Sequence, residues 1–163
     1  MRDQLREAFV GAMGRVVSSV TIVTTDGPAG RFGVTVSAMS SVSADPPMLL
    51  VCINRRNPTC NAISANRAFA VSVLAADQVE VAQTFAGRPK AGTPFDFGTA
   101  AWRVGLTGCP VLERAVAAFD CRLHHAHDEA THRILIGEVV SALAGPGDPL
   151  LYGRRAYRRP APV

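Results

Sequence analysis

The chain has 163 residues, of which 48% are hydrophobic and 18% are charged. This composition excludes a disordered or fibrous protein, and the length suits one domain, which we expect to span residues 1–163. The 17 basic and 13 acidic residues give a formal charge of +4. Four arginines and no acid lie in the last ten residues, so the other 13 basic residues balance the 13 acids. This distribution disfavours a nucleic-acid-binding body and leaves a basic tail.

The N-terminal third predicts one helix followed by strands. Residues 3–13 place apolar side chains at helical spacing. They also carry charges throughout, unlike a signal peptide or a membrane span. Runs rich in β-branched residues at 16–25, 31–39 and 48–54 predict strands. The turn signal DGPAG between the first two runs favours an antiparallel pair.

Two further helix starts are visible in the middle of the chain. Asn57 followed by Pro58 predicts the N-cap and first residue of a short helix. After a strand-like run at 68–75, Asp77 and Glu80 have the spacing of a capping box.

The second half predicts a surface excursion and then two long strands. Residues 87–110 are rich in Gly and Pro and lie outside any regular pattern. Strands are predicted at 115–124 and 132–143, joined by the polar segment 125–131. An antiparallel barrel with covering helices is the most economical architecture for this order of elements.

Two segments are candidate binding sites. At the helix start after residue 54, exposed N–H groups, Arg55, Arg56 and the Thr59 hydroxyl could hold a phosphate, or could form an ordinary capped helix with solvated arginines. The hydroxyl-rich segment 35–43 could offer N–H groups and hydroxyls to a flat heteroaromatic ligand, or could be a Ser-rich connection.

Several other sites are excluded or disfavoured. The glycines at 27, 30 and 33 do not match G-x-G-x-x-G, and neither a P-loop nor a G-x-S-x-G elbow is present. Four histidines between 124 and 132 lack a coordinating Cys, so we expect no metal. The four cysteines show no paired spacing, which indicates a reduced, cytoplasmic protein. His132 opens a predicted strand and could serve as a positioning donor or be a solvated hairpin histidine.

Taken in order, several motifs resemble the short-chain flavin reductase family. They are VTIVTTDGPAGRFGVTVSAMSSVSADPPMLLVCINRR at 20–56, FAG at 85–87, TGCPVL at 107–112, TH at 131–132 before ILIGEV, and PLLY at 149–152. The resemblance runs from about residue 5 to residue 159. It implies a mainly β fold, an antiparallel Greek-key, FMN-binding split β-barrel with a few covering helices.

The resemblance also implies an activity. Members transfer a hydride from NADH or NADPH to FMN or FAD and supply reduced flavin to a partner monooxygenase through diffusion. We therefore expect an NAD(P)H:flavin oxidoreductase that forms a homodimer and has neither a nucleic acid nor a membrane as partner.

Site residues are implied in the same way. The isoalloxazine is expected on Thr35, Val36, Ser37 and Ala38, near Ser41, Val42 and Ser43, with the ribityl chain and phosphate on Cys52, Ile53, Asn54, Arg55 and Thr59. Phe85, Ala86, Gly87 and Arg88 are expected to approach the flavin of a neighbouring subunit. His132 is expected to position the nicotinamide, with Tyr152 and Arg154 on the same side.

Two other functions remain open on the sequence. The chain could be a non-catalytic split-barrel module that binds flavin or another cofactor as a sensor or carrier. The Arg-rich tail could contact nucleic acid or a membrane surface.

Overall fold

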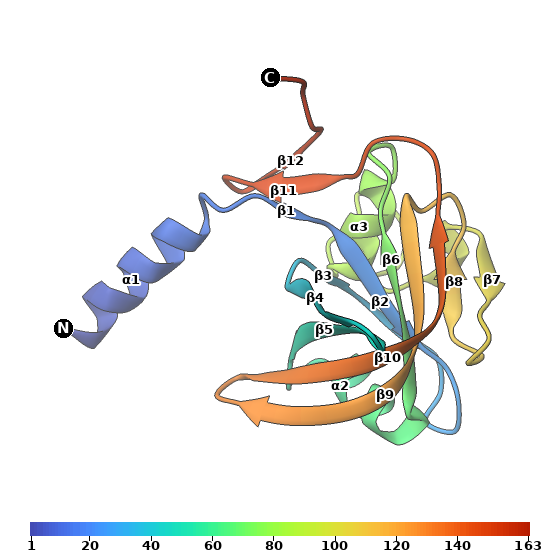
Figure 1. Cartoon of the computed structure of the whole chain (residues 1–163). Helices are drawn as coiled ribbons and strands as arrows, with labels where there is room; N and C mark the ends of the chain where they lie inside the picture. The colour runs from blue at the N-terminus through green and yellow to red at the C-terminus, as the bar shows by residue number, and fades with distance from the viewer.

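The computed structural model describes residues 1–163 and is mainly β, with three α-helices at its periphery (Figure 1). Seven antiparallel strands form one sheet in the order β3-β2-β6-β9-β10-β5-β4. Their bounds are β2 (Thr21–Thr25), β3 (Phe32–Val36), β4 (Met39–Ala44), β5 (Pro47–Asn54), β6 (Ala68–Val73), β9 (Ala117–Glu129) and β10 (His132–Ala144). The antiparallel, mainly β fold expected from the sequence is confirmed.

The barrel is closed by the chain and not by hydrogen bonds. The edge strands β3 and β4 stand at opposite ends of the sheet order, yet only Ser37 and Ala38 separate them in the sequence. The sheet must therefore curl until its two edges meet, although no ladder joins them. We call this unpaired junction at Ser37 and Ala38 the seam.

The interior of the barrel is a dry apolar core. Val23, Val51, Phe69 and Leu135 are fully buried in it and come from four different strands. A second apolar cluster lies on the other face of β2, under helix α3 (Val79–Phe85). Because both faces of β2 are covered, all five of its residues are buried, including three threonines. The hydroxyls of these threonines donate to the backbone carbonyls of Val36, Pro110 and Ala68.

One of the two predicted helix starts is confirmed. Helix α2 (Pro58–Asn66) begins after Asn57, whose side chain accepts the backbone N–H of Thr59 at 2.9 Å. The capping box at Asp77 is wrong, because α3 begins after Gln78 without a side-chain cap. The Asp77 carboxylate instead pairs with Arg114 at 2.5 Å.

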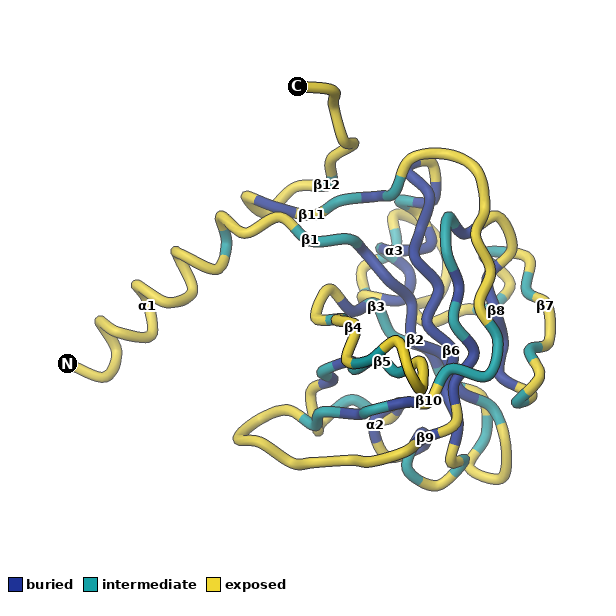
Figure 2. The backbone as a smooth tube through the Cα atoms, in the orientation of Figure 1, coloured by how far each residue is buried: buried dark blue, intermediate teal, exposed yellow.

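A slender arm leaves the barrel (Figure 1). It consists of helix α1 (Arg2–Met13) and the small sheet of β1 (Ser18–Ser19), β11 (Leu151–Gly153) and β12 (Ala156–Arg158). Every residue of α1 is exposed, as Figure 2 shows. None of the three helices is long and apolar enough to cross a bilayer.

The excursion between α3 and β9 also contains regular structure. It holds a 3-10 turn η1 (Phe97–Thr99) and the hairpin of β7 (Trp102–Val104) and β8 (Pro110–Leu112). The ring of Phe85 meets those of Phe97 and Trp102 edge-on, and all three centroids lie 5.0 to 5.5 Å apart, which fastens this segment to α3.

Two predicted loops are strands. The expected connection 125–131 is wrong, because β9 continues to Glu129 and only Ala130 and Thr131 form the turn. The left-handed φ of +50° at Ala130 makes this tight turn possible. Residues 39–44, within the hydroxyl-rich segment, form β4 and pair with β5.

Candidate functional site

The seam presents two free backbone donors. The N–H groups of Ser37 and Ala38 donate to no backbone or side-chain acceptor, and both residues are exposed. Thr35 is already committed, since its hydroxyl donates to the carbonyl of Ala82 at 2.7 Å. A planar ligand that presents acceptors along one edge can therefore complete the hydrogen bonding of the seam through the backbone.

The ends of β5 and β10 place further polar groups beside the seam. The N–H of Cys52 in β5 donates to the carbonyl of Ala38 at 3.0 Å, which ties the strand to the seam. Asn54 lies two residues farther along, roughly 7 Å at the usual rise of a strand. His132, the first residue of β10, pairs directly with Asn54, so both side chains leave the same face of the sheet.

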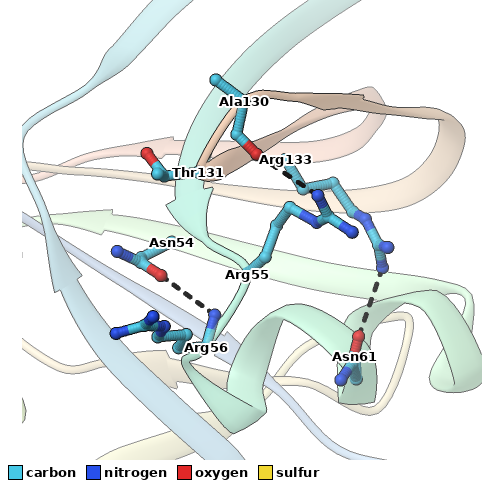
Figure 3. A pocket seen from close by; sticks show the side chains of 7 residues that line it. All are labelled: Asn54, Arg55, Arg56, Asn61, Ala130, Thr131 and Arg133. Carbon is cyan, nitrogen blue, oxygen red and sulfur yellow. Dashed lines mark hydrogen bonds between the residues drawn. The ribbon is translucent and has the colours of Figure 1, made fainter.

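A basic cavity opens just beyond Asn54. Its volume is about 570 Å³, and its lining residues are Asn54, Arg55, Arg56, Asn61, Ala130, Thr131 and Arg133 (Figure 3). Three of these seven carry a guanidinium and none carries a carboxylate. Arg56 makes no ion pair and no side-chain hydrogen bond, and only its backbone N–H is held, by Asn54 at 2.9 Å. The cavity is therefore suited to a small anion.

One carboxylate lies behind two of these arginines. Asp128 accepts from Nε and Nη2 of Arg133 at 2.5 and 3.0 Å and lies 3.3 Å from Nε of Arg55. The hydrogen bond from Arg133, followed by the charges of Arg133 and Arg55, holds the pKa of Asp128 below its usual value. The same hydrogen bond raises the pKa of Arg133. Asp128 and Arg133 therefore stay charged at neutral pH.

Thr59, in the first turn of helix α2, does not line this cavity. Thr59 is buried and lines a second cavity of about 290 Å³ together with Arg31, Phe32 and Phe95. The structure thus brings Asn54 and Arg55 together but places Thr59 on another side of the helix start.

The other expected site residues fall into two groups, those with buried side chains and those that are exposed or half-buried. The side chains of Val36, Ile53 and Phe85 are buried in the apolar core, so only their backbones can meet a ligand. The ring of Phe85 packs against Phe97 and Trp102, so the expected approach of Phe85 to the flavin of a neighbouring subunit stays a prediction for its backbone. Exposed or half-buried are Ser41, Val42 and Ser43 in β4, Cys52 in β5, and Ala86, Gly87 and Arg88 after α3.

Tyr152 and Arg154 lie on the arm and not beside His132 within one chain (Figure 1). The ring of Tyr152 meets that of Tyr157 edge-on at 5.2 Å. Arg154 and Arg155 form the turn between β11 and β12, with left-handed φ values of +52° and +59°. Their expected place on the same side as His132 stays a prediction.

Arg133 and Asp128 were missed by sequence reasoning, together with Asn61 and Thr131. Asp128 and Arg133 face each other across the β9–β10 ladder, so only the correct hairpin register pairs them. Reading that pair requires the two-residue turn at 130–131, in place of which the sequence predicted a longer loop.

No group of three or more His, Cys, Asp or Glu residues is arranged to hold a metal ion. All four cysteines are free thiols.

Comparison with known proteins identifies the family. The profile described as "Flavin reductase like domain" matches residues 13–161. The chain belongs to the flavin reductase family. It is 42% identical to the FMN reductase (NADH) RutF of Enterobacter cloacae over 162 residues, which cover 96% of each chain. It is 45% identical to the RutF of Agrobacterium fabrum, covering 92% of this chain and 86% of that protein.

Solved flavin reductases share the whole fold. The flavin reductase PheA2 superposes with a TM-score of 0.86 and 30% identity, covering 96% of this chain and 98% of PheA2. BorF, the flavin reductase component of a bacterial two-component tryptophan halogenase, has a TM-score of 0.84 and 33% identity, covering 94% and 97%. The NADH:FAD oxidoreductase SgcE6 of Streptomyces globisporus has a TM-score of 0.84 and 35% identity, covering 99% and 94%.

Proposed function

We propose that this flavin reductase oxidises NADH, transfers the hydride to FMN, and releases reduced flavin to a partner monooxygenase. Relatives at 40 to 45% identity are named FMN reductase (NADH), which supports this pair of substrates over FAD and NADPH. A neighbour described as the reductase component of a two-component system supports a separate flavin-using partner. The observation that carries the proposal is the pair of free N–H groups at the seam, next to a cavity lined by three arginines.

The flavin is assigned along a single path on this surface. The N–H groups of Ser37 and Ala38 face acceptors on the edge of the isoalloxazine, with the exposed or half-buried side chains of β4 at its rim. The ribityl chain follows Cys52 and Asn54 to the end of β5, and the phosphate reaches Arg55 and Arg56. The five carbons of the ribityl chain suit the roughly 7 Å that separates Cys52 from Asn54 along the strand.

His132 is assigned to positioning the nicotinamide. Its Nδ1 lies 2.9 Å from the hydroxyl of Thr131, which fixes the orientation of the ring. When bound, the flavin accepts a hydride from the nicotinamide, and this transfer needs no proton abstraction by the protein. The contribution of His132 is therefore to hold the two rings at reacting distance.

A second copy of the chain is proposed to complete the site. The arm and the β9–β10 hairpin project from the same side of the barrel (Figure 1). The apolar stripe of α1 is uncovered, with Leu5 and Phe9 being 73% and 62% exposed. Docking of this arm on a partner would bury the stripe and can bring the partner's Tyr152 and Arg154 toward the flavin. We also propose a cytoplasmic location, since all four cysteines are free thiols.

Activity and binding together test the proposal. The purified protein should bind FMN and oxidise NADH only when FMN is added, with NADPH the poorer donor. Tight flavin binding without reduction by either nucleotide would instead support the non-catalytic module. Failure both to bind flavin and to oxidise NADH would reject both functions.

A further inference from the structure

We infer that Asp128 is an internal competitor for the flavin phosphate and keeps the flavin exchangeable by occupying two of the arginines in the basic cavity. The inference rests on the proposed assignment of the phosphate to this cavity. It names a residue that lies outside the cavity lining.

Each of the three nitrogens of the Arg133 guanidinium donates a hydrogen bond within the protein. Nε and Nη2 donate to Asp128, while Nη1 donates to Ser64 at 3.0 Å and Asn61 at 3.4 Å. Arg55 is similarly engaged, with Nε beside Asp128 and Nη1 donating to the carbonyl of Ala130 at 3.2 Å. Only Arg56 offers a guanidinium without an internal partner. An incoming phosphate can meet Arg56 directly, but it must share or replace the contacts of Asp128 to engage Nε of Arg55, or Nε and Nη2 of Arg133.

Removing the carboxylate should strengthen binding and not disorder the site. Without Asp128, Arg133 keeps its contacts to Asn61 and Ser64 on helix α2, and Arg55 keeps its contact to Ala130. Both guanidiniums stay oriented, and their freed nitrogens face an anion instead of a fixed carboxylate. The phosphate of FMN carries close to two negative charges at neutral pH, so the fixed negative charge behind the arginines also opposes it.

This arrangement fits a reductase whose product must leave. Three guanidiniums attract the phosphate, and one carboxylate weakens their hold, so that the flavin binds and still exchanges. The charge of Asp128 is stable over the working pH range, because its pKa is lowered and the carboxyl stays ionised.

The test compares FMN with riboflavin, which lacks the phosphate, on the full-length protein. Asp128→Asn should lower the Kd for FMN about tenfold, the change that ~1.4 kcal/mol produces, and slow FMN dissociation. The Kd for riboflavin should change less than about twofold. Asp77→Asn is the matched control, since it removes the carboxylate of an exposed arginine pair before α3 and should leave both values unchanged.

The variant Arg56→Ala distinguishes a failure of the inference about Asp128 from a failure of the proposed phosphate site. If Arg56→Ala weakens FMN binding and Asp128→Asn fails to tighten it, the inference about Asp128 is overturned and the phosphate site stands. If Arg56→Ala leaves FMN and riboflavin equally unaffected, the phosphate lies elsewhere and both assignments fall. Asp128→Ser provides a second variant if the Asn side chain destabilises the hairpin, and a thermal unfolding curve without flavin identifies that case.

Discussion

His132 and Asn54 lie directly opposite each other where β10 begins and β5 ends, so the imidazole and the carboxamide share one face of the barrel. The two elements that carry them are held by a continuous antiparallel ladder from His132–Asn54 to Glu138–Met48. This ladder fixes the position of the imidazole relative to the seam.

Replacing His132 by Ala should impair the reaction with NADH and spare flavin binding. We expect kcat/KM for NADH to fall roughly 10- to 100-fold, because the nicotinamide is no longer held at reacting distance. The Kd for FMN, measured by quenching of flavin fluorescence, should stay within about twofold. His124→Ala, on an exposed part of β9, is the control. A large loss of FMN affinity in His132→Ala would show that this histidine binds the flavin and does not position the nicotinamide.

Disrupting the apolar stripe of α1 should convert the proposed dimer into a monomer. A charge at Phe9, introduced as Phe9→Glu, cannot be buried in an interface without a large desolvation penalty. Sedimentation velocity should show half the mass of the native protein, together with a loss of most activity. Glu7→Gln on the same exposed helix should change neither. A native protein that sediments as a monomer would exclude the shared site.

Much of the barrel could be predicted from the sequence because its strands are short apolar runs between clear turn signals. Helix α2 could also be placed, since Asn57 and Pro58 carry both N-terminal signals locally. The tip of the β9–β10 hairpin could not be predicted from the sequence. Residues 124–130 are exposed and mostly polar, with Ala126 and Ala130 as the exceptions, so no hydrophobic pattern marks the strand. Its pairing with β10 holds it in place.

The residues of the basic cavity were predictable only where they are adjacent in the chain. Asn54 ends strand β5 and Arg55 follows it, and both were found from that strand. Arg133 joins them because the hairpin turn and the β5–β10 register bring it there, and neither has a local signal strong enough to read. Thr59 shows the reverse error, since its nearness in sequence to Arg55 does not place it in the same cavity.

Arg154 and Arg155 should affect the nucleotide and not the flavin. Two consecutive non-glycine residues in the left-handed region cost about 1 kcal/mol or more each, which a Gly or Asn turn would avoid. Replacing both by Ala should raise KM for NADH about three- to tenfold through lost contacts to its phosphates. The Kd for FMN should not change. The opposite pattern, with FMN weakened and NADH unaffected, would reject this assignment.

Gly33→Ala should destabilise the barrel. A Cβ at this position would lie 2.8 Å from the buried ring of Phe85, closer than packed carbon atoms approach. We expect a loss of about 1 to 3 kcal/mol in the free energy of unfolding, measured with urea. Gly11→Ala in α1 is the control, because nothing lies within 4 Å of its added Cβ. Equal stability of Gly33→Ala and the native protein would show that Phe85 can move aside.

The buried thiols should be unreactive in the folded protein. Burial, assisted by the nearby carboxylate of Asp120, raises the pKa of Cys121 to about 12, so only about one thiol in 10⁴ is ionised at pH 8. Burial also raises the pKa of the other three cysteines. A thiol reagent at pH 8 should label Cys60, Cys109 and Cys121 slowly in the native chain and all four cysteines rapidly in urea. Rapid labelling of Cys121 in the native protein would contradict this burial.

The same cysteines give a pH dependence of stability. A folded-state pKa above the unfolded value, about 8.5, contributes stability that is present below that pH and is lost as the pH rises above it. The free energy of unfolding should therefore decline between pH 8.5 and 11, and urea titrations at pH 7.5 and 10 would measure the difference.

The unpaired junction between β3 and β4 has a mechanical consequence. A sheet whose edges are joined by covalent bonds but by no ladder can widen at that line without breaking a single interstrand hydrogen bond. Elsewhere every neighbouring pair of strands in the sheet is joined by an antiparallel ladder, with register shifts only in the β9–β10 and β4–β5 pairs, so the rest of the barrel wall is stiffer than the seam. The fold thus concentrates its compliance in one place, and a flat ring can be admitted and let go there while the apolar core stays intact.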